Sequence, residues 1–293
     1  MKLRFIINPI SGSRDNSNIA ELVKNNLNHD KFKYDIFYTE RKKHAIELSE
    51  NAVKEKIDVV IAVGGDGTLN ECAQPIIGTD TALSVIPRGS GNGFAHHLNI
   101  EQDVINCIKN LNHSAISEVD SCTANGKPFI NVSGIGFDAH IAHLFSKISV
   151  RGFSSYVKLV LKECILYPSK DYIIKYDNKE KKVNAFLISW ANSSQFGNNA
   201  VISPESKIDD GYFEICIVKK LPRILIPILL FRLFNKSIQR SKYVEIIKCK
   251  EAQILCDDGR SHLDGETYNL GGQIKIKNIP LSLKIFTTNG QEN

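Results

Sequence analysis

The chain of 293 residues is long enough for two domains, and its composition, 42% apolar and 24% charged, is typical of a folded protein. Its formal net charge of +5 comes from scattered lysine pairs rather than one dense basic block, which argues against a nucleic-acid-binding protein. The seven cysteines include no C-x-x-C pair, so we expect reduced thiols in a cytoplasmic protein.

The first part of the chain alternates between strand and helix patterns. Apolar, β-branched runs predict strands at residues 3–9, 33–39, 58–63 and 82–87. Apolar residues at helical spacing predict helices near residues 19–27, 45–53, 68–77 and 104–111. This rhythm predicts a three-layer α/β domain, in which an open parallel sheet carries helices on both faces.

Beyond residue 118 the pattern changes. Residues 119–123 and 129–132 read as a hairpin joined through Asn125–Gly126, and one helix follows over Phe153–Cys164. The rest consists of short alternating strands, at residues 171–177, 183–192, 211–218, 243–257, 273–278 and 281–286. We therefore expect a second domain built as an antiparallel β-sandwich, and we set the limits at 1–125 and 126–284.

The segment LPRILIPILLFRLF, Leu221–Phe234, has two interpretations. It contains two prolines and two arginines and is shorter than the roughly 20 residues of a membrane-spanning helix. One interpretation is a buried helix or linking segment of the core. The other is a surface helix that enters a membrane, with Arg223, Arg232 and Lys236 near the lipid headgroups.

Three glycine-rich turns follow predicted strands. VVIAVGGDGTLNE (59–71) and PRGSGNGFAHHL (87–98) both lead into helices, and INPISGS (7–13) ends the first strand. Glycines allow close approach, and a helix start offers free N–H groups to a phosphate. The first cluster has no Walker A lysine. The structural alternative is a pair of tight strand-to-helix turns, with Asp66 or Thr68 as a helix cap.

These motifs together resemble the diacylglycerol kinase catalytic family, which also includes sphingosine kinases and bacterial lipid kinases. GGDGTLNE, NPISG and PRGSGNGFA carry the resemblance in the first half. In the second half, FINVSGIGFDAHI (129–141), SPESKIDDGYFEI (203–215) and LDGE (263–266) continue it in the same order. The resemblance thus covers nearly the whole chain.

The resemblance implies an ATP-dependent lipid kinase of phospholipid synthesis that uses Mg²⁺. It also implies that the chain end, 285–293, returns to the first domain. The residues expected to contact ATP are Asn8, Ser11, Thr39, Gly64, Gly65, Asp66, Gly67, Thr68, Leu69, Asn70 and Ser90. Glu266 or Asp66 would take the proton of the acceptor hydroxyl. Asp210, with the carbonyls of Lys207 and Tyr212, resembles a bound-cation site, although Asp209–Gly211 also fits a plain hairpin turn.

The family further implies a cytoplasmic protein that visits the membrane surface, where its lipid acceptor lies. Homodimer formation is left open by the sequence. Two departures concern the second turn: Gly93 stands where bacterial relatives carry Asp, and His96 and His97 stand where arginine is common. The alternative functions are an NAD kinase-like phosphotransferase acting on a soluble acceptor and a non-catalytic nucleotide-binding regulator.

Overall fold

The computed structural model describes residues 1–12, 16, 18–147 and 153–288, and the chain divides into two compact units. Unit 1 comprises Met1–Val119 and the C-terminal segment from Leu281, and unit 2 comprises Asp120–Pro280. The domain limits expected from the sequence stay a prediction. Within the expected return segment, residues 289–293 lie outside the described residues.

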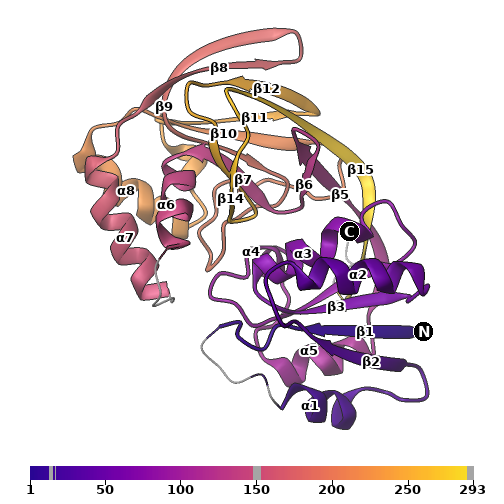
Figure 1. Ribbon diagram of the computed structural model, residues 1–293. Helices are drawn as coiled ribbons and strands as arrows, with labels where there is room; N and C mark the ends of the chain where they lie inside the picture. The colour runs from indigo at the N-terminus through magenta and orange to yellow at the C-terminus, as the bar shows by residue number, and fades with distance from the viewer. Residues whose placement is uncertain (13–15, 17, 148–152, 289–293) are drawn as a thin grey trace. The chain divides into compact units, whose positions relative to one another are not determined.

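Unit 1 is built on the predicted parallel sheet (Figure 1). Its strands lie in the order β2-β1-β3-β4, and the end of β15 joins beside β4 with Ile285 opposite Leu83. The strand bounds are β1 (Lys2–Ile7), β2 (Lys33–Tyr38), β3 (Val59–Gly64), β4 (Ala82–Pro87) and β15 (Gln273–Thr287). The parallel register brings the carboxyl ends of β1, β3 and β4 to one edge of the sheet.

Helices cover both faces of this sheet, because alternate strand side chains point to opposite sides. The helices are α1 (Ile19–Asn26), α2 (His44–Lys54), α3 (Asp66–Ile76), α4 (Gly93–His97) and α5 (Val104–Leu111). Helices α1 and α5 pack on one face, where Phe5 and Ile61 are fully buried, and α2 and α3 lie on the other (Figure 1). Helix α3 begins at Asp66, two residues earlier than expected, because Gly65 already takes the extended conformation of an N-cap.

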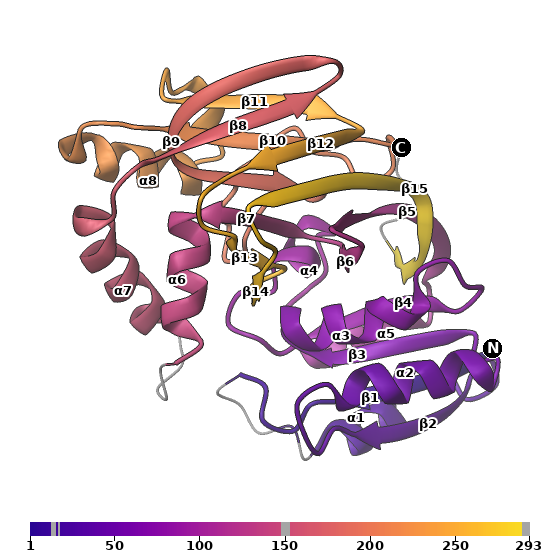
Figure 2. The same ribbon diagram turned by 45° about the horizontal axis from the view of Figure 1, so that its top comes forward.

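Unit 2 is an antiparallel β-sandwich, as expected (Figure 2). Its strands follow the path β14-β13-β7-β9-β8-β12-β15, and β9 also pairs with β10, which pairs with β11. Trp190, Phe129 and Phe213 fill the core between the layers. The bounds are β5 (Ala115–Ala124), β6 (Lys127–Phe129), β7 (Val132–Gly136), β8 (Lys170–Tyr176), β9 (Lys179–Ala191), β10 (Phe213–Lys219), β11 (Val244–Cys249), β12 (Glu251–Leu255), β13 (Arg260–Leu263) and β14 (Glu266–Asn269).

Two strand predictions in unit 2 were wrong in detail. The expected strand 243–257 is two strands, because β11 pairs with β10 whereas β12 pairs with β8 and β15. The expected strands 273–278 and 281–286 are one strand, β15, which passes through Leu281 at a φ of 46° instead of ending. The β13–β14 hairpin that contains LDGE was not foreseen.

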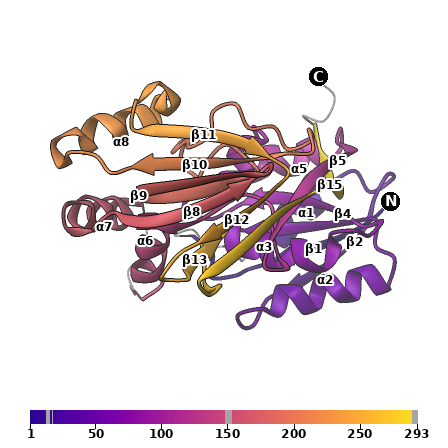
Figure 3. The same ribbon diagram turned by 90° about the horizontal axis from the view of Figure 1, so that it is seen from above.

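The helices of unit 2 gather at one end of its sandwich (Figure 3). Their bounds are α6 (Phe137–Phe145), α7 (Phe153–Leu166), η1 (Arg223–Leu225), α8 (Ile226–Phe234) and η2 (Ile238–Arg240). Helix α6 was not expected, because the glycine-rich signature that precedes it masks the apolar spacing. Within the described residues, none of the helices has the length and apolar character needed to cross a bilayer.

Candidate functional site

The glycine-rich turns after β1, β3 and β4 contact one another in unit 1. A Cβ atom built on Gly89 would lie 2.5 Å from the Cα atom of Gly65, and one built on Gly12 would lie 2.1 Å from the Arg88 carbonyl oxygen. The Arg88 N–H also donates to the Gly64 carbonyl oxygen over 2.8 Å. The three turns therefore form one backbone surface at the carboxyl edge of the sheet, where open α/β folds bind ligands.

This contact between the turns explains the glycines without any ligand. Gly65 and Gly89 are needed because the two turns touch, and a side chain on either would separate them. Gly64 faces Thr68, whose hydroxyl oxygen would lie 2.5 Å from an added Cβ atom. The glycines are thus required by the packing of the turns. A phosphate would be contacted by the backbone of these turns.

A buried polar network supports the first turn. The Asn8 side-chain amide donates to the Thr68 hydroxyl over 3.0 Å, and the Ser11 hydroxyl donates to the Asn8 carbonyl over 3.0 Å. Asn16, almost fully buried, donates to that same carbonyl over 2.9 Å and accepts from Arg88 Nε over 2.6 Å. Asn16 thereby links the first and third turns. The sequence did not single it out, because an asparagine in a polar stretch carries no periodic signal.

The start of α3 places the remaining residues expected near ATP. Asp66 is the first residue of the helix and is partly exposed. The N-cap residue, Gly65, has no side chain with which to cap the helix. The side chains of Leu69 and Asn70 are buried, so Leu69 can offer a ligand only its backbone.

Two further residues complete the expected nucleotide set. The Thr39 N–H donates to the Ile7 carbonyl over 2.9 Å, which holds the end of β2 beside Asn8, and Ser90 is exposed at the tip of the third turn. The nucleotide contacts of this set stay a prediction.

In unit 2, Glu266 follows a tight hairpin turn. Asp264 and Gly265 connect β13 to β14 with φ angles of 48° and 87°, as a two-residue turn of the primed type requires. The Asp264 carboxylate is buried and accepts hydrogen bonds from the N–H groups of Ile130 and Asn131, both over 2.9 Å. The LDGE motif is therefore an anchored turn that fixes the position of Glu266.

A second buried group lies beside this turn. His262 Nδ1 accepts a hydrogen bond from the Gly265 N–H over 3.3 Å, and His262 Nε2 lies 3.3 Å from an Asp138 carboxylate oxygen. The Ser189 hydroxyl donates to the same oxygen over 2.8 Å. The turn thus lies close to Asp138 of α6 and Ser189 of β9, although sequence spacing gave no sign of this proximity.

The residues expected to bind a cation are engaged within the protein. The Asp210 carboxylate accepts from the Lys248 ammonium group and, over 3.1 Å, from the Tyr212 N–H. The Tyr212 carbonyl accepts from the Asn278 side chain over 3.1 Å. Asp210 and Tyr212 therefore already take part in hydrogen bonds within unit 2. The cation role of Lys207, Asp210 and Tyr212 stays a prediction, and no reaction step below depends on it.

Glu214, close to this turn, was missed by the sequence reasoning. Burial raises the pKa of its carboxyl group to about 7, and a hydrogen bond from the Ser206 hydroxyl opposes that rise. The only available signal, a glutamate inside an apolar strand, is easily read as an outward-facing position. Among the described residues, no group of three or more His, Cys, Asp or Glu side chains is arranged to hold a metal ion.

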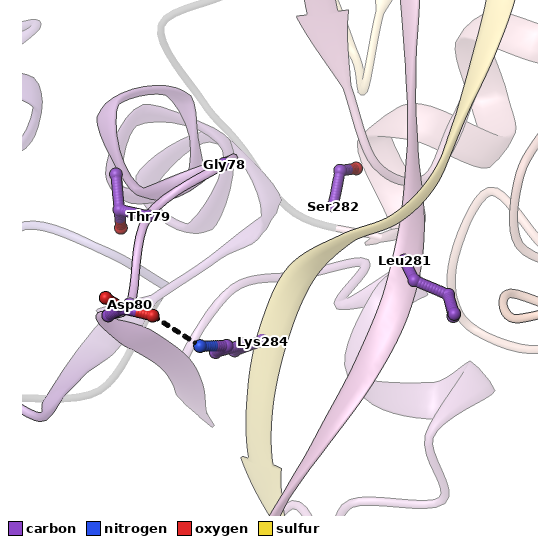
Figure 4. A pocket seen from close by; sticks show the side chains of 6 residues that line it. All are labelled: Gly78, Thr79, Asp80, Leu281, Ser282 and Lys284. Carbon is purple, nitrogen blue, oxygen red and sulfur yellow. Dashed lines mark hydrogen bonds and ion pairs between the residues drawn. The ribbon is translucent and has the colours of Figure 1, made fainter.

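A surface hollow of about 290 Å³ lies at the opposite end of β4 (Figure 4). It is lined by Gly78, Thr79, Asp80, Leu281, Ser282 and Lys284. Asp80 and Lys284 form an ion pair of 2.7 Å across it, and the Gly78 N–H donates to the Ser282 carbonyl over 2.7 Å. Because Gly78, Thr79 and Asp80 precede β4, whereas the third glycine-rich turn follows it, the hollow is separate from the glycine-rich turns.

Comparison with known proteins identifies both halves of the chain. Residues 2–124 match the diacylglycerol kinase catalytic domain, and residues 131–287 match the YegS C-terminal NAD kinase beta sandwich-like domain. The chain belongs to the diacylglycerol kinase catalytic-domain family. The resemblance expected from the sequence motifs is thereby confirmed.

Relatives in this family cover most of the chain. It is 30% identical to the diacylglycerol kinase of Staphylococcus aureus strain JH9 over 75% of this chain and 71% of the relative. It is 26% identical to the diacylglycerol kinase of Staphylococcus saprophyticus over 100% of this chain and 97% of the relative. A Bacillus anthracis crystal structure of a proposed diacylglycerol kinase superposes with a TM-score of 0.81 at 24% identity, over 98% of this chain and 96% of that chain. That likeness confirms the fold.

Proposed function

We propose that this protein is an ATP-dependent lipid kinase that transfers the γ-phosphoryl group of MgATP to the hydroxyl of diacylglycerol or a related lipid alcohol. The observation that carries the proposal is the single backbone surface formed by the three glycine-rich turns of unit 1. Membership of the diacylglycerol kinase catalytic-domain family supports a lipid acceptor. Asp66, the carboxylate at the start of α3, is the residue that would hold Mg²⁺ together with the nucleotide phosphates.

In this proposal, unit 1 binds the nucleotide through its backbone. Phosphoryl transfer requires in-line placement and neutralisation of charge, which N–H groups at a helix start can supply. The N-terminus of α3, which follows the glycine N-cap Gly65, would supply such groups. Asn8, Ser11 and Thr68 hold the turn that faces them in one conformation. Asp66 would orient the metal-bound phosphates or assist removal of the acceptor proton.

Glu266 would act as the general base in this reaction. The anchored Asp264–Gly265 turn fixes the backbone on which Glu266 stands, which is the preorganisation that a base needs. A carboxylate that takes the acceptor proton as the new P–O bond forms contributes roughly 10²–10⁴-fold. Because the acceptor would be a lipid, the enzyme would act at the cytoplasmic surface of a membrane.

The decisive experiment offers [γ-³²P]ATP and Mg²⁺ with dispersed diacylglycerols, long-chain amino alcohols, other lipid alcohols and NAD. We expect label in the organic phase. Label in NAD alone would instead indicate an NAD kinase-like enzyme, and ATP binding without any transfer would indicate a regulator.

A variant pair tests the role of Glu266. Glu266→Gln should lower kcat by roughly 10²–10⁴-fold. Glu251→Gln, at an exposed strand position, should keep full activity. Turnover of Glu266→Gln within a few-fold of the unmodified protein would rule out the general-base role.

A further inference from the structure

The outward face of η1 and α8 carries large apolar side chains in contact with solvent. Ile224, Ile228, Phe231 and Phe234 are 83, 52, 67 and 44% exposed, and we call these four residues the α8 surface. The opposite face of the helix already packs into the core of unit 2, through Ile226, Leu229, Leu230 and Leu233. A surface helix normally turns polar residues outward, so an apolar outward face of this kind marks an interaction site.

The segment that carries the α8 surface has charges of one sign only. The stretch from Lys219 to Val244 contains no Asp or Glu. Its cations are Lys219, Lys220, Arg223, Arg232, Lys236, Arg240 and Lys242. Lys219 pairs with Glu245, whereas Arg223, Arg232 and Lys236 form no ion pair with a described residue. Cations that flank an exposed apolar helix face are the pattern of helices that lie in a membrane interface.

The charge also argues against a second copy of this chain as the occupant. In a two-fold dimer the same patch faces itself, so Arg223, Arg232 and Lys236 would be brought near their own counterparts. An anionic bilayer offers the complementary charge together with an apolar interior.

Helix α7 lies at the same end of unit 2 as α8 (Figures 1–3). Its exposed residues include Leu161, Ile165 and Leu166.

We propose that the α8 surface docks this protein on anionic lipid bilayers. Ile228 and Phe231 enter the boundary between headgroups and acyl chains, and Arg223 and Lys236 lie at the level of the lipid phosphates. The inference deepens the proposed function by naming the surface that meets the membrane. It rests on that function only for the identity of the acceptor, because docking needs neither ATP nor catalysis.

The test is co-sedimentation of the full chain with vesicles, without nucleotide. The vesicles contain phosphatidylcholine with phosphatidylglycerol, or phosphatidylcholine alone. Ile228→Ser with Phe231→Ser should lower the partition coefficient on anionic vesicles by at least about tenfold, because two large side chains no longer enter the bilayer. Arg223→Gln with Lys236→Gln should cause a loss of about tenfold on anionic vesicles and little change on neutral ones. Ile116→Ser, at an exposed apolar position of unit 1, is the matched control and should bind normally.

Two outcomes would overturn the docking proposal. One is anionic-vesicle binding by the Ile228/Phe231 variant that equals that of Ile116→Ser. The other is sedimentation of the unmodified protein as a dimer that this variant splits while vesicle binding persists, which would assign the surface to a second copy.

Kinase assays with a dispersed short-chain diacylglycerol separate this result from the proposed function. Equal rates for the variant and the unmodified protein, with a lower variant rate on vesicle-embedded diacylglycerol, support docking. Vesicle binding by an unmodified protein that phosphorylates no lipid refutes the proposed kinase and leaves docking standing.

Discussion

Replacing Asp264 with Asn should destabilise the protein by about 2–3 kcal/mol. The Asp264 carboxylate is buried and accepts two backbone hydrogen bonds of 2.9 Å, from Ile130 and Asn131. An asparagine keeps the shape and the left-handed conformation, but its amide can accept only one of these bonds and turns a donor toward the other N–H. The loss of a hydrogen bond to a charged group, about 1.5–3 kcal/mol, sets the magnitude. Urea unfolding followed by tryptophan fluorescence measures it.

Asp177 provides the matched control for this substitution. It also lies in a two-residue hairpin turn with a positive φ, 45°, but its side chain is exposed and forms no hydrogen bond with a described residue. Asp177→Asn should therefore change the free energy of unfolding by less than about 0.5 kcal/mol. The reasoning is refuted if Asp264→Asn and Asp177→Asn differ by less than that amount.

Three further predictions concern other parts of the chain. Gly89→Ala should destabilise by about 1–3 kcal/mol and weaken ATP binding in calorimetry, because its Cβ atom would displace the facing turn, whereas Gly78→Ala meets no neighbour and should leave ATP binding intact. The raised pKa of Glu214 means that the folded carboxyl keeps a proton that the unfolded chain loses above pH 4.5. Stability measured by thermal melts should therefore fall as pH rises from about 4.5 to 7, by up to about 1.4 kcal/mol per pH unit, and Glu214→Gln should remove this component. Asp66→Asn should destabilise α3 by about 0.3–1 kcal/mol. It should also lower kcat more than about tenfold if the carboxylate takes part in the chemistry. A kcat within two-fold of the unmodified protein would show that Asp66 only stabilises the helix terminus.

The alternating part of the fold could be read from the sequence because its determinants are local. In unit 1, fully apolar runs such as Val59–Gly64 and helical stripes such as Val104–Leu111 carry their own period, and both elements form where expected. In unit 2, the break between β11 and β12 depends on which strands they pair with, and partners far along the chain leave no mark on residues 243–257. In Leu221–Phe234, one helix face is buried in the core and the other is exposed, and entry of this helix into a membrane stays a prediction.

In the candidate site, the motifs themselves could be predicted from the sequence, but the residues that hold them in place could not. The motifs GGDGT and GSGN could be located because each places glycines beside a predicted strand end, whereas LDGE was located only through its resemblance to the family motif. The groups that hold them could not, since Asn16, His262 and Asp138 act through long-range contacts that spacing cannot encode. The structure also gives a second explanation for Gly65 and Gly89, which the sequence had associated with phosphate binding. They permit two turns to touch, and that contact brings the N-terminus of α3 beside the third turn. A carboxylate at this terminus, Asp66, stabilises the helix through its interaction with the helix dipole. A loss of stability in Asp66→Asn is therefore expected whether or not Asp66 takes part in catalysis. Only a change in kcat distinguishes a catalytic role from a structural one.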